Sequence, residues 1–334
     1  MDVSRYEEQV YINMKKALVL GAGGFIGSHL VKRLKDDGMW VRGVDLKHPD
    51  HWDTFADDFV IGDLRDVNVV ASTLDQVFDE VYQLAADMGG AGYINTGDND
   101  ADVMGNSILI NVNVLKRAQE LGVKSVFFSS TACVYQECNQ MDPSSINCKE
   151  DTVYPASPDT EYGWEKLFSE RLYTAYNKNH GMKNKIARYH NVFGPYGTWD
   201  GGKEKAPAAI CRKVAKATDE VEIWGDGNQH RSFLYIDECI RATVEFYREP
   251  EFFEPINIGS EKHVSINELV DIVSEIANKS LTKKHIDGPI GVHARTSDNT
   301  LFKSVMGWAV DEDLKAGLTK TYSWIHEQVA LTTP

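Results

Sequence analysis

A tyrosine and a lysine four residues apart are the first side chains in this sequence whose types and spacing could do chemistry. Tyr162 and Lys166 stand in the stretch EYGWEK, and at that spacing on a helix they share one face. A neighbouring ammonium lowers the pKa of a phenol, so Tyr162 would be a general base near neutral pH. The pair predicts an enzyme that oxidises an alcohol by hydride transfer, in which Tyr162 takes the hydroxyl proton.

A hydroxyl and a thiol stand upstream of this pair, in the stretch SSTACVY. Thr131 could bind the same substrate oxygen as Tyr162, and Cys133 follows two residues later. Oxidising an alcohol requires no thiol, so Cys133 needs an explanation of its own. A free cysteine just after a strand is most often a small buried apolar side chain. The other possibility is a proton-transfer group, because surroundings can bring a thiol pKa into the working range.

A glycine-rich turn near the N-terminus predicts a dinucleotide site. The stretch GAGGFIG follows an apolar strand and opens an amphipathic helix. In that context glycines let the backbone approach a pyrophosphate at the helix N-terminus, where N–H groups and the helix dipole favour an anion. The predicted cofactor-binding residues of this turn are Gly21, Gly23, Gly24, Phe25, Ile26 and Gly27.

Acidic residues after the next two strands indicate which dinucleotide binds. Asp45 stands about 18 residues beyond the turn, where a carboxylate accepts hydrogen bonds from the ribose hydroxyls. It would repel a 2'-phosphate, so NAD is favoured over NADP. Asp63, with Leu64 beside it, is predicted to contact the adenine. The alternative for Asp63 is an ordinary turn aspartate.

Short apolar strands alternate with helix-length segments over the first half of the chain, at KALVL, WVRGVDL, FVIG, EVYQLAA and SVFFSS. This order predicts an α/β protein with a Rossmann-type, doubly wound parallel sheet. We expect an N-terminal extension at 1–15, an NAD-binding domain at 16–185, and a smaller α/β domain at 186–334 that mainly binds substrate, with segments interleaved between the two. In the second half, VEIWGDGNQHRSFLYIDE reads as two strands around a turn, and a capping box at Ser265 and Glu268 marks a helix start.

Composition excludes several classes of protein. The 334 residues are 42% hydrophobic and carry a formal net charge of -15, which argues against nucleic-acid or membrane-surface partners because both need a basic face. Five scattered cysteines fit neither a disulfide framework nor a paired metal site. No stretch approaches the length of a membrane span. We expect a cytoplasmic protein without a metal.

The glycine turn, SSTACVY and YGWEK together resemble the extended short-chain dehydrogenase/reductase family of NAD-dependent epimerases and dehydratases, whose members act largely on nucleotide sugars. The resemblance covers nearly the whole chain. The longer stretches AADMGGAGYI, RYHNVFGPYGTWDGGKEKAPAAICRK and WGDGNQHRSF resemble the branch that epimerises GDP-mannose at C3 and C5. This implies NAD held throughout the cycle, a GDP-sugar substrate, a transient 4-ketone and a homodimer formed through two helices per subunit.

The same resemblance assigns roles to individual residues. Cys133 and Lys205 would be a pair of acid/base groups on opposite faces of the sugar ring, and Tyr162, Lys166 and Thr131 would serve C4. A 4-ketone makes the hydrogens at C3 and C5 acidic, so this branch needs proton-transfer groups, and the thiol of Cys133 would be one of them. The substrate-binding residues implied are Gly89, Thr131, Cys133, Asn191, Glu204, Lys205, Ala206, Lys213, Gln229, Arg231 and Arg295.

Two residues depart from the pattern of that branch. Thr131 stands where serine is common, and His293 stands where a second basic residue is expected beside Arg295. Two other readings remain. A nucleotide-sugar 4-epimerase or 4,6-dehydratase would lack the epimerising pair, and dehydratases place an acidic residue directly after the threonine. A catalytically silent nucleotide-binding regulatory protein would be expected to have lost Tyr162 or Lys166.

Overall fold

The computed structural model describes residues 14–288 and 291–332. Its largest sheet has seven strands in the order β11-β6-β5-β4-β1-β2-β3, which contains the 3-2-1-4-5-6 order of Rossmann folds. The five strands predicted from the first half of the sequence all form, and the predicted fold class is confirmed. The strands of this sheet are β1 (Lys16–Leu20), β2 (Trp40–Asp45), β3 (Asp58–Ile61), β4 (Glu80–Gln83), β5 (Phe127–Thr131), β6 (Lys185–Tyr189) and β11 (Ile256–Ile258).

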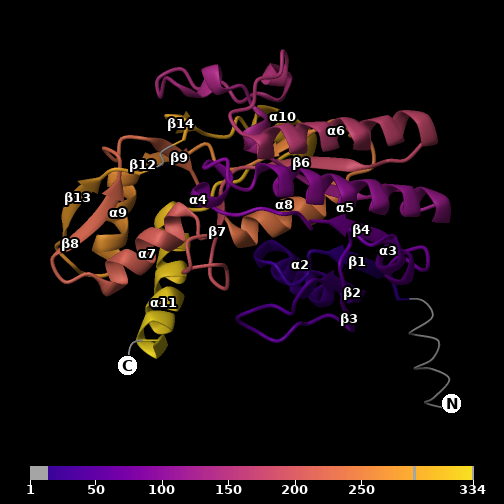
Figure 1. Cartoon of the computed structure of the whole chain (residues 1–334), viewed down its shortest axis with the longest axis horizontal. Coiled ribbons are helices and arrows are strands. Elements are labelled where there is room, and N and C mark those ends of the chain that lie inside the picture. The colour runs from indigo at the N-terminus through magenta and orange to yellow at the C-terminus, as the bar shows by residue number, and fades with distance from the viewer. Residues whose placement is uncertain (1–13, 289–290, 333–334) are drawn as a thin grey trace. The chain divides into compact units, whose positions relative to one another are not determined.

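The chain divides into two compact units. The first contains the described residues up to Ala86, together with Leu109–Phe128 and Tyr173–Asn184. Strands β1, β2, β3 and β4 pair in parallel within it. Helix α2 (Phe25–Asp36) packs against β1 and β2, and α3 (Val67–Thr73) follows β3. These elements form the indigo part of Figure 1. The strands are apolar because helices and neighbouring strands bury both faces of a parallel sheet.

The second unit contains Asp87–Ile108, Ser129–Leu172 and the described residues from Lys185 onward. Strand β5 and the helices α5 and α6 each run from one unit into the other. The unit also holds β6 and β11, which pair in parallel. The helical elements between β4 and β6 are α4 (Ala91–Ile94), α5 (Asp100–Leu121), the 3-10 turns η1 (Ala132–Val134), η2 (Glu137–Gln140) and η3 (Glu150–Val153), and α6 (Glu161–His180).

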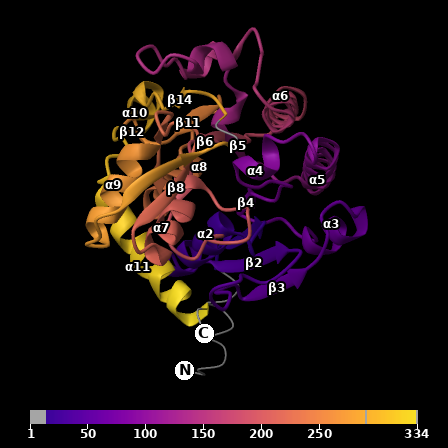
Figure 2. The same cartoon turned by 60° about the vertical axis from the view of Figure 1, so that its left-hand side comes forward.

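The later part of the second unit is built from three small sheets and several helices. Helices α7, α9 and α11 pack on one another beside the β8–β13 pair (Figure 2). Strands β8 and β9 form on either side of the predicted turn, but they join different sheets: β8 pairs with β13, and β9 pairs with β12 and β14. These elements are β7 (Val192–Phe193), α7 (Ala206–Lys216), β8 (Glu220–Trp224), β9 (His230–Ser232), β10 (Leu234–Tyr235), α8 (Ile236–Arg248), β12 (His263–Ser265), α9 (Ile266–Ile276), β13 (Thr282–Ile286), β14 (Ala294–Arg295), α10 (Thr300–Met306) and α11 (Leu314–Thr332).

Two further expectations can be compared with this architecture. The capping box is confirmed, because Ser265 and Glu268 exchange both hydrogen bonds at the start of α9. The chain enters the second unit for the last time at Lys185, and the expected domains at 16–185 and 186–334, with their cofactor and substrate roles, stay predictions. Most of the expected extension lies outside the described residues. No helix in the described ranges is long and apolar enough to cross a lipid bilayer.

Candidate active site

The glycine turn between β1 and α2 is shaped by contacts that leave no room for side chains. Gly21 has φ of +88°, and a Cβ there would lie 2.8 Å from the backbone nitrogen of Ala85. A Cβ on Gly27 would lie 2.0 Å from the carbonyl oxygen of Gly21. Gly24 is the N-cap of α2 and supplies no side-chain cap. The N-terminus of α2 therefore keeps the character of an anion site, as the predicted phosphate contact requires.

The two acidic candidates of the first unit differ in their surroundings. Asp45 accepts hydrogen bonds from the backbone nitrogens of Gly23 at 2.9 Å and Leu46 at 2.7 Å, and burial raises its pKa. Asp45 thus ties the end of β2 to the glycine turn. Asp63 is more exposed and pairs with Arg65 at 2.6 Å, which lowers the pKa of Asp63. Both ligand contacts stay predictions, as does that of the buried Leu64.

Helix α6 brings Tyr162 and Lys166 into the second unit's core beside Cys133. Tyr162 is 7% exposed and packs with Val103 and Cys133. The approach depends on Gly163, because a Cβ there would lie 2.3 Å from the carbonyl oxygen of Cys133. Our sequence reasoning missed Gly163, although a glycine between two aromatic residues inside a predicted helix was a signal of close packing.

The predicted effect of Lys166 on Tyr162 is wrong for the chain by itself. The Nζ of Lys166 donates a hydrogen bond to the carbonyl oxygen of Ser129 at 2.9 Å and lies 5.8 Å from the centre of the tyrosine ring. Burial raises the pKa of Tyr162 and Cys133 adds to the increase, whereas a hydrogen bond with Thr131 opposes it. A phenolate near neutral pH therefore needs positive charge beyond what these residues supply.

Cys133 is held by a set of polar contacts that a packing cysteine would not need. The Thr131 Oγ1 accepts a hydrogen bond from the Cys133 backbone nitrogen at 3.2 Å. The buried Arg295 donates from Nη1 to the sulfur at 3.0 Å and from Nε to the Oε1 of Gln140. Its Nη2 pairs with Asp159 at 3.2 Å. Gln140 and Asp159 carried no sequence signal, because they meet Arg295 only through the fold.

Lys205 is the N-cap residue of α7, and Cys133 acts on it electrostatically. Its side chain stays open to solvent, yet surrounding protein lowers its pKa, while Cys133 and Cys239 work in the opposite direction. Cys133 also acts electrostatically on Tyr162 and Arg295. The structure therefore brings Thr131 into hydrogen-bond contact with Cys133, and Tyr162 and Lys205 within its electrostatic range.

The predicted substrate-binding arginines both reach this cluster. Burial, and then the positive charge of Arg295, lower the pKa of Arg231 to about 10, while Asp159 and Cys133 raise it. Arg231 also donates to the carbonyl oxygen of Val292 at 2.5 Å. Arg295 was predicted to hold substrate, and in the structure its guanidinium contacts protein groups on three sides. A contact with phosphate stays a prediction for both.

Other predicted substrate residues lie elsewhere in the second unit. The Nζ of Lys213 donates a hydrogen bond to the carbonyl oxygen of Glu222 in β8 at 2.8 Å. The same Nζ lies 5.8 Å from the centre of the Trp224 ring. Gln229 donates to the Trp224 carbonyl at 3.4 Å, and its Oε1 is buried without a partner among the described residues. Asn191, with φ of +39°, donates to a carbonyl of β9. The structure thus groups Lys213 and Gln229 around Trp224.

Three predicted residues are explained locally by packing. Glu204 pairs with Arg212 at 2.5 Å, and Ala206 is the first residue of α7. The glycine at Gly89 was expected to admit the sugar, but a Cβ there would lie 2.7 Å from the Cβ of Tyr93. The side chain of Tyr93 is therefore sufficient reason for this glycine.

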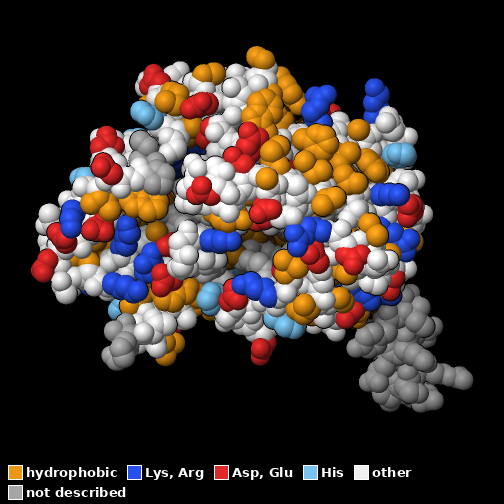
Figure 3. Space-filling view, in the orientation of Figure 1, with side chains coloured by type: hydrophobic (Ala, Val, Ile, Leu, Met, Phe, Trp, Pro, Cys, Tyr) orange, Lys and Arg blue, Asp and Glu red, His pale blue; other side chains and the backbone are white. Residues whose placement is uncertain are grey.

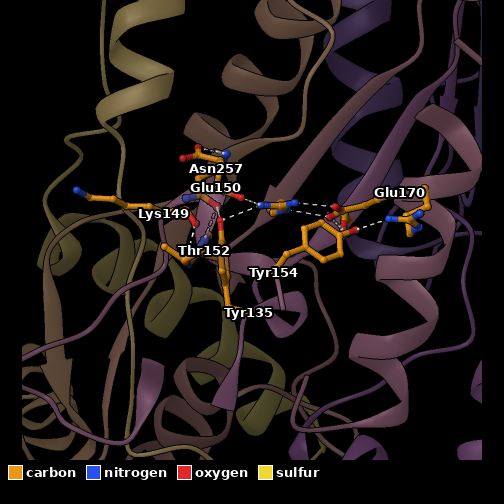
Figure 4. Close-up of polar contacts among 11 residues, drawn as sticks. Tyr135, Lys149, Glu150, Thr152, Tyr154, Glu170 and Asn257 are labelled. Atoms are coloured by element: carbon orange, nitrogen blue, oxygen red, sulfur yellow. Dashed lines mark hydrogen bonds and ion pairs between the residues drawn. The ribbon is translucent and has the colours of Figure 1, made fainter. Parts of the chain in front are cut away.

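A buried polar network fixes the end of β5, where the candidate hydroxyl and thiol begin. Glu170 accepts from Ser130 at 2.5 Å and pairs with Arg188 at 2.7 Å. Arg188 continues to the hydroxyl of Tyr135, which donates to Asn257 at 2.6 Å. Figure 4 shows Glu170, Tyr135 and Asn257 in this network. Because every member is buried, the loss of one partner would leave a charge uncompensated.

His190 is a structural member of this network. Its Nε2 lies 3.1 Å from the Oδ1 of Asn257. The Asn257 Nδ2 donates to two carbonyls, so its Oδ1 is an acceptor and the imidazole donates from Nε2. Burial, together with the positive charges of Arg295 and Arg188, lowers the pKa of His190 to about 3, and the hydrogen bond with Asn257 opposes this shift.

We expect His190 to make the protein less stable in acid. An unfolded histidine takes up a proton near pH 6.5, whereas folded His190 resists protonation down to about pH 3. Stability is therefore fully present above pH 6.5 and lost as the pH falls, by about 2 kcal/mol at pH 5. Urea unfolding at pH 7 and pH 5 should show a smaller loss for His190→Gln than for the unmodified protein. Equal losses would contradict this, and exposed His326→Gln is the control.

Comparisons with known proteins agree with this geometry. Residues 17–259 match the model of the NAD dependent epimerase/dehydratase family. The chain is 45% identical over 316 residues to a GDP-mannose 3,5-epimerase of Arabidopsis thaliana, which covers 94% of this chain and 83% of the relative. It is 27% identical to a UDP-glucuronate 4-epimerase of Thermodesulfobacterium geofontis, over 94% of this chain and 97% of the relative.

A solved structure shows the same fold. The UDP-glucuronic acid 4-epimerase from Bacillus cereus, in complex with UDP-glucuronic acid and NAD, superimposes with a TM-score of 0.79. The two are 28% identical, and the match covers 94% of this chain and 99% of that one.

Proposed function

Because this chain belongs to the NAD dependent epimerase/dehydratase family, we propose that it is a GDP-mannose 3,5-epimerase. It would invert the configuration of the sugar at C3 and C5, giving GDP-L-galactose, GDP-L-gulose or both. The 45% identity to a plant enzyme of that name supports the substrate. The observation that carries the proposal is the thiol of Cys133, which receives a hydrogen bond from buried Arg295 beside Tyr162 and Thr131.

NAD is the cofactor of this family, and the first unit fits it. The side-chain-free N-terminus of α2 and the carboxylate of Asp45 are the groups that would hold its pyrophosphate and ribose. When bound as NAD+, it supplies a hydride acceptor and a positive charge. Burial raises the pKa of Tyr162, and a positive charge would act in the opposite direction and favour loss of its proton.

The proton of the C4 hydroxyl would pass to Tyr162. Thr131 would orient that hydroxyl, and it also accepts the backbone hydrogen bond of Cys133. Lys166 would hold the geometry through the carbonyl of Ser129 at the end of β5. Loss of this proton together with the C4 hydride would leave a 4-ketone, which allows a carbanion at either neighbouring carbon to be stabilised as an enolate. Return of the hydride and the proton to C4 would restore the hydroxyl at the end.

Inversion at each neighbouring carbon then requires two proton-transfer groups. One removes the proton from one face of the ring, and the other returns a proton to the opposite face. Cys133 and Lys205 would be these groups, which the electrostatic effect of Cys133 on Lys205 supports. The lowered pKa of Lys205 favours its neutral form, which can accept a proton.

The diphosphate of a GDP-sugar needs cations, and this acidic chain has few near the cluster. Arg295 is buried, Arg231 is half-buried and interacts electrostatically with Cys133, and Lys213 lies beside Trp224. Guanidinium groups suit phosphate because their donors match its oxygens in pairs. The buried, unpartnered Oε1 of Gln229 supports a polar contact near Trp224.

Solvent exchange tests the proposal. The purified protein is incubated with GDP-mannose in deuterated water, and NMR locates the deuterium in the sugar. We expect label at C3 and C5 in products of altered configuration, and NAD released from the protein on denaturation. Unlabelled GDP-mannose would sink the proposal. Inversion confined to C4, or loss of the 6-hydroxyl, would favour the 4-epimerase or 4,6-dehydratase reading.

We also propose a homodimer, because two long helices expose apolar side chains. Helix α5 exposes Leu109 and Val112, and α6 exposes Trp164 and Phe168 at 40% and 49%. Figure 3 shows hydrophobic side chains gathered over α6. Phe168→Asp should convert a dimer into a monomer, measured as mass by light scattering. A mass that stays that of the unmodified protein would exclude α6 from the interface, and exposed Leu331→Asp is the control.

The cysteines support a reducing compartment. All five are free thiols, and only Cys138 is exposed. A cytoplasmic location is therefore our proposal.

A further inference from the structure

The short segment around α4 contacts both candidate acid/base regions. Tyr93 and Ile94 pack against the cluster formed by Val103, Cys133 and Tyr162. The Tyr93 ring also contacts Lys203, whose Nζ lies 4.1 Å from the ring centre. Lys203 stands two residues before Lys205. The ring of Tyr93 is thus shared between the thiol side and the lysine side of the site.

Tyr93 is fixed more firmly than a half-buried surface tyrosine would be. Its hydroxyl donates to the Oδ1 of Asp87 at 2.9 Å. The Oδ2 of Asp87 accepts from Asn106 at 2.8 Å, and its backbone nitrogen donates to Ser107 at 3.1 Å, so α5 anchors the aspartate. Gly89 lies directly under the tyrosine, since a Cβ there would meet the Tyr93 Cβ at 2.7 Å.

The backbone before Lys205 rests on the same segment. A Cβ on Gly90 would lie 2.6 Å from the carbonyl oxygen of Glu204 and 3.0 Å from that of Lys203. From the other side, the Glu204 carboxylate is held by Arg212 at 2.5 Å. Lys205 follows at once as the N-cap of α7, so the position of its backbone depends on this packing.

We propose that Tyr93 is a positioning residue that sets where Lys205 lies relative to Cys133, acting through Lys203 and Gly90. The inference rests on the proposed function. Two groups on opposite faces of one sugar ring must both reach the same carbon, and a displacement of about 1 Å can cost about a hundredfold in rate. The doubled glycine at Gly89 and Gly90 allows the close packing that this requires.

The readout is the fraction of labelled sugar that is inverted. Inversion requires both proton-transfer groups, whereas exchange with retained configuration requires only the group that removes the proton. By reversibility, Lys205 removes protons in one direction of the reaction and returns them in the other. Reactions in deuterated water therefore start from GDP-mannose and, separately, from its epimer. The informative direction is the one in which Lys205→Ala still gives labelled sugar of retained configuration.

In that direction, Tyr93→Leu should lower the ratio of inverted to retained labelled sugar by about tenfold, because the ring that contacts Lys203 is lost. Leucine keeps an apolar side chain against the cluster of Cys133, so the fold should be retained. Lys203→Gln should lower the ratio by about threefold, the size of a cation–π contact at an exposed site. Tyr93→Phe, which keeps the ring face, should lower it less than Tyr93→Leu. Exposed Lys303→Gln is the control and should match the unmodified protein.

An unchanged ratio in both Tyr93→Leu and Lys203→Gln, with an active unmodified protein, would overturn the positioning role. Should Tyr93→Leu not fold, the ratio in Lys203→Gln decides alone, since that side chain is exposed. An unmodified protein that gives no labelled sugar would overturn the proposed function, and this inference with it.

Discussion

Cys133→Ala is expected to abolish epimerisation while C4 oxidation continues. Inversion needs a proton-transfer group on each face of the ring, and alanine removes one of them without adding bulk. The loss of a general acid/base group costs about 10²- to 10⁴-fold in rate, so products of altered configuration should fall by at least about a hundredfold. Tyr162, Thr131 and Lys166 remain, so the 4-keto sugar should still form. Trapping with borodeuteride and mass spectrometry would detect it.

Two controls separate chemistry from packing. Cys138→Ala removes an exposed thiol that lies outside the cluster, and it should keep full turnover. Cys133→Ser keeps an acceptor for the hydrogen bond from Arg295, but a hydroxyl exchanges protons with carbon far less readily than a thiol, so its epimerisation should also be low. Full epimerisation by Cys133→Ala would show that the thiol only packs.

Tyr162→Phe is expected to stop every step, including C4 oxidation. The substitution removes one oxygen and keeps the ring that packs with Val103 and Cys133, so the fold should be retained. The phenol is the group that we propose takes the C4 hydroxyl proton, so the substitution removes the base of this step. We expect both the trapped 4-keto sugar and the labelled sugar to fall by about 10²- to 10⁴-fold.

The contrast between the two variants is the strongest test of the assignment. Cys133→Ala should accumulate a 4-keto sugar that Tyr162→Phe cannot make. Formation of the 4-keto sugar by Tyr162→Phe at the normal rate would rule out the tyrosine as the base. Tyr176→Phe, farther along α6, is the matched control, and thermal unfolding would verify that each variant is folded.

Local sequence was sufficient for the first five strands, the start of α9 and the turn that is predicted to hold the cofactor. Strands β1 to β5 are short apolar runs, and the capping box at Ser265 depends only on residues three apart. The glycine turn is equally local, because the contact between Gly27 and Gly21 lies within seven residues. Such features follow from backbone sterics and neighbouring side chains, which a sequence displays directly.

The sequence also indicated which residues would meet around Cys133, but only through a resemblance. Nothing local relates Cys133 to Lys205 or Arg295, since they lie far apart along the chain. The predicted influence of Lys166 on Tyr162 was wrong for the chain by itself, and for a different reason. Spacing placed the two on one face of α6, but burial raises the pKa of the tyrosine, and the ammonium of Lys166 donates to the carbonyl oxygen of Ser129.

The sequence by itself therefore determined the fold class, the nucleotide turn and the types of residue available for catalysis. Only the tertiary structure decided that Arg295 donates to the sulfur of Cys133, that Gly163 brings α6 against its carbonyl, and that Tyr93 contacts both sides of the site. The physical reason is that burial and long-range contacts set these energies. A buried charge or a 3 Å contact between distant segments exists only after the chain has packed.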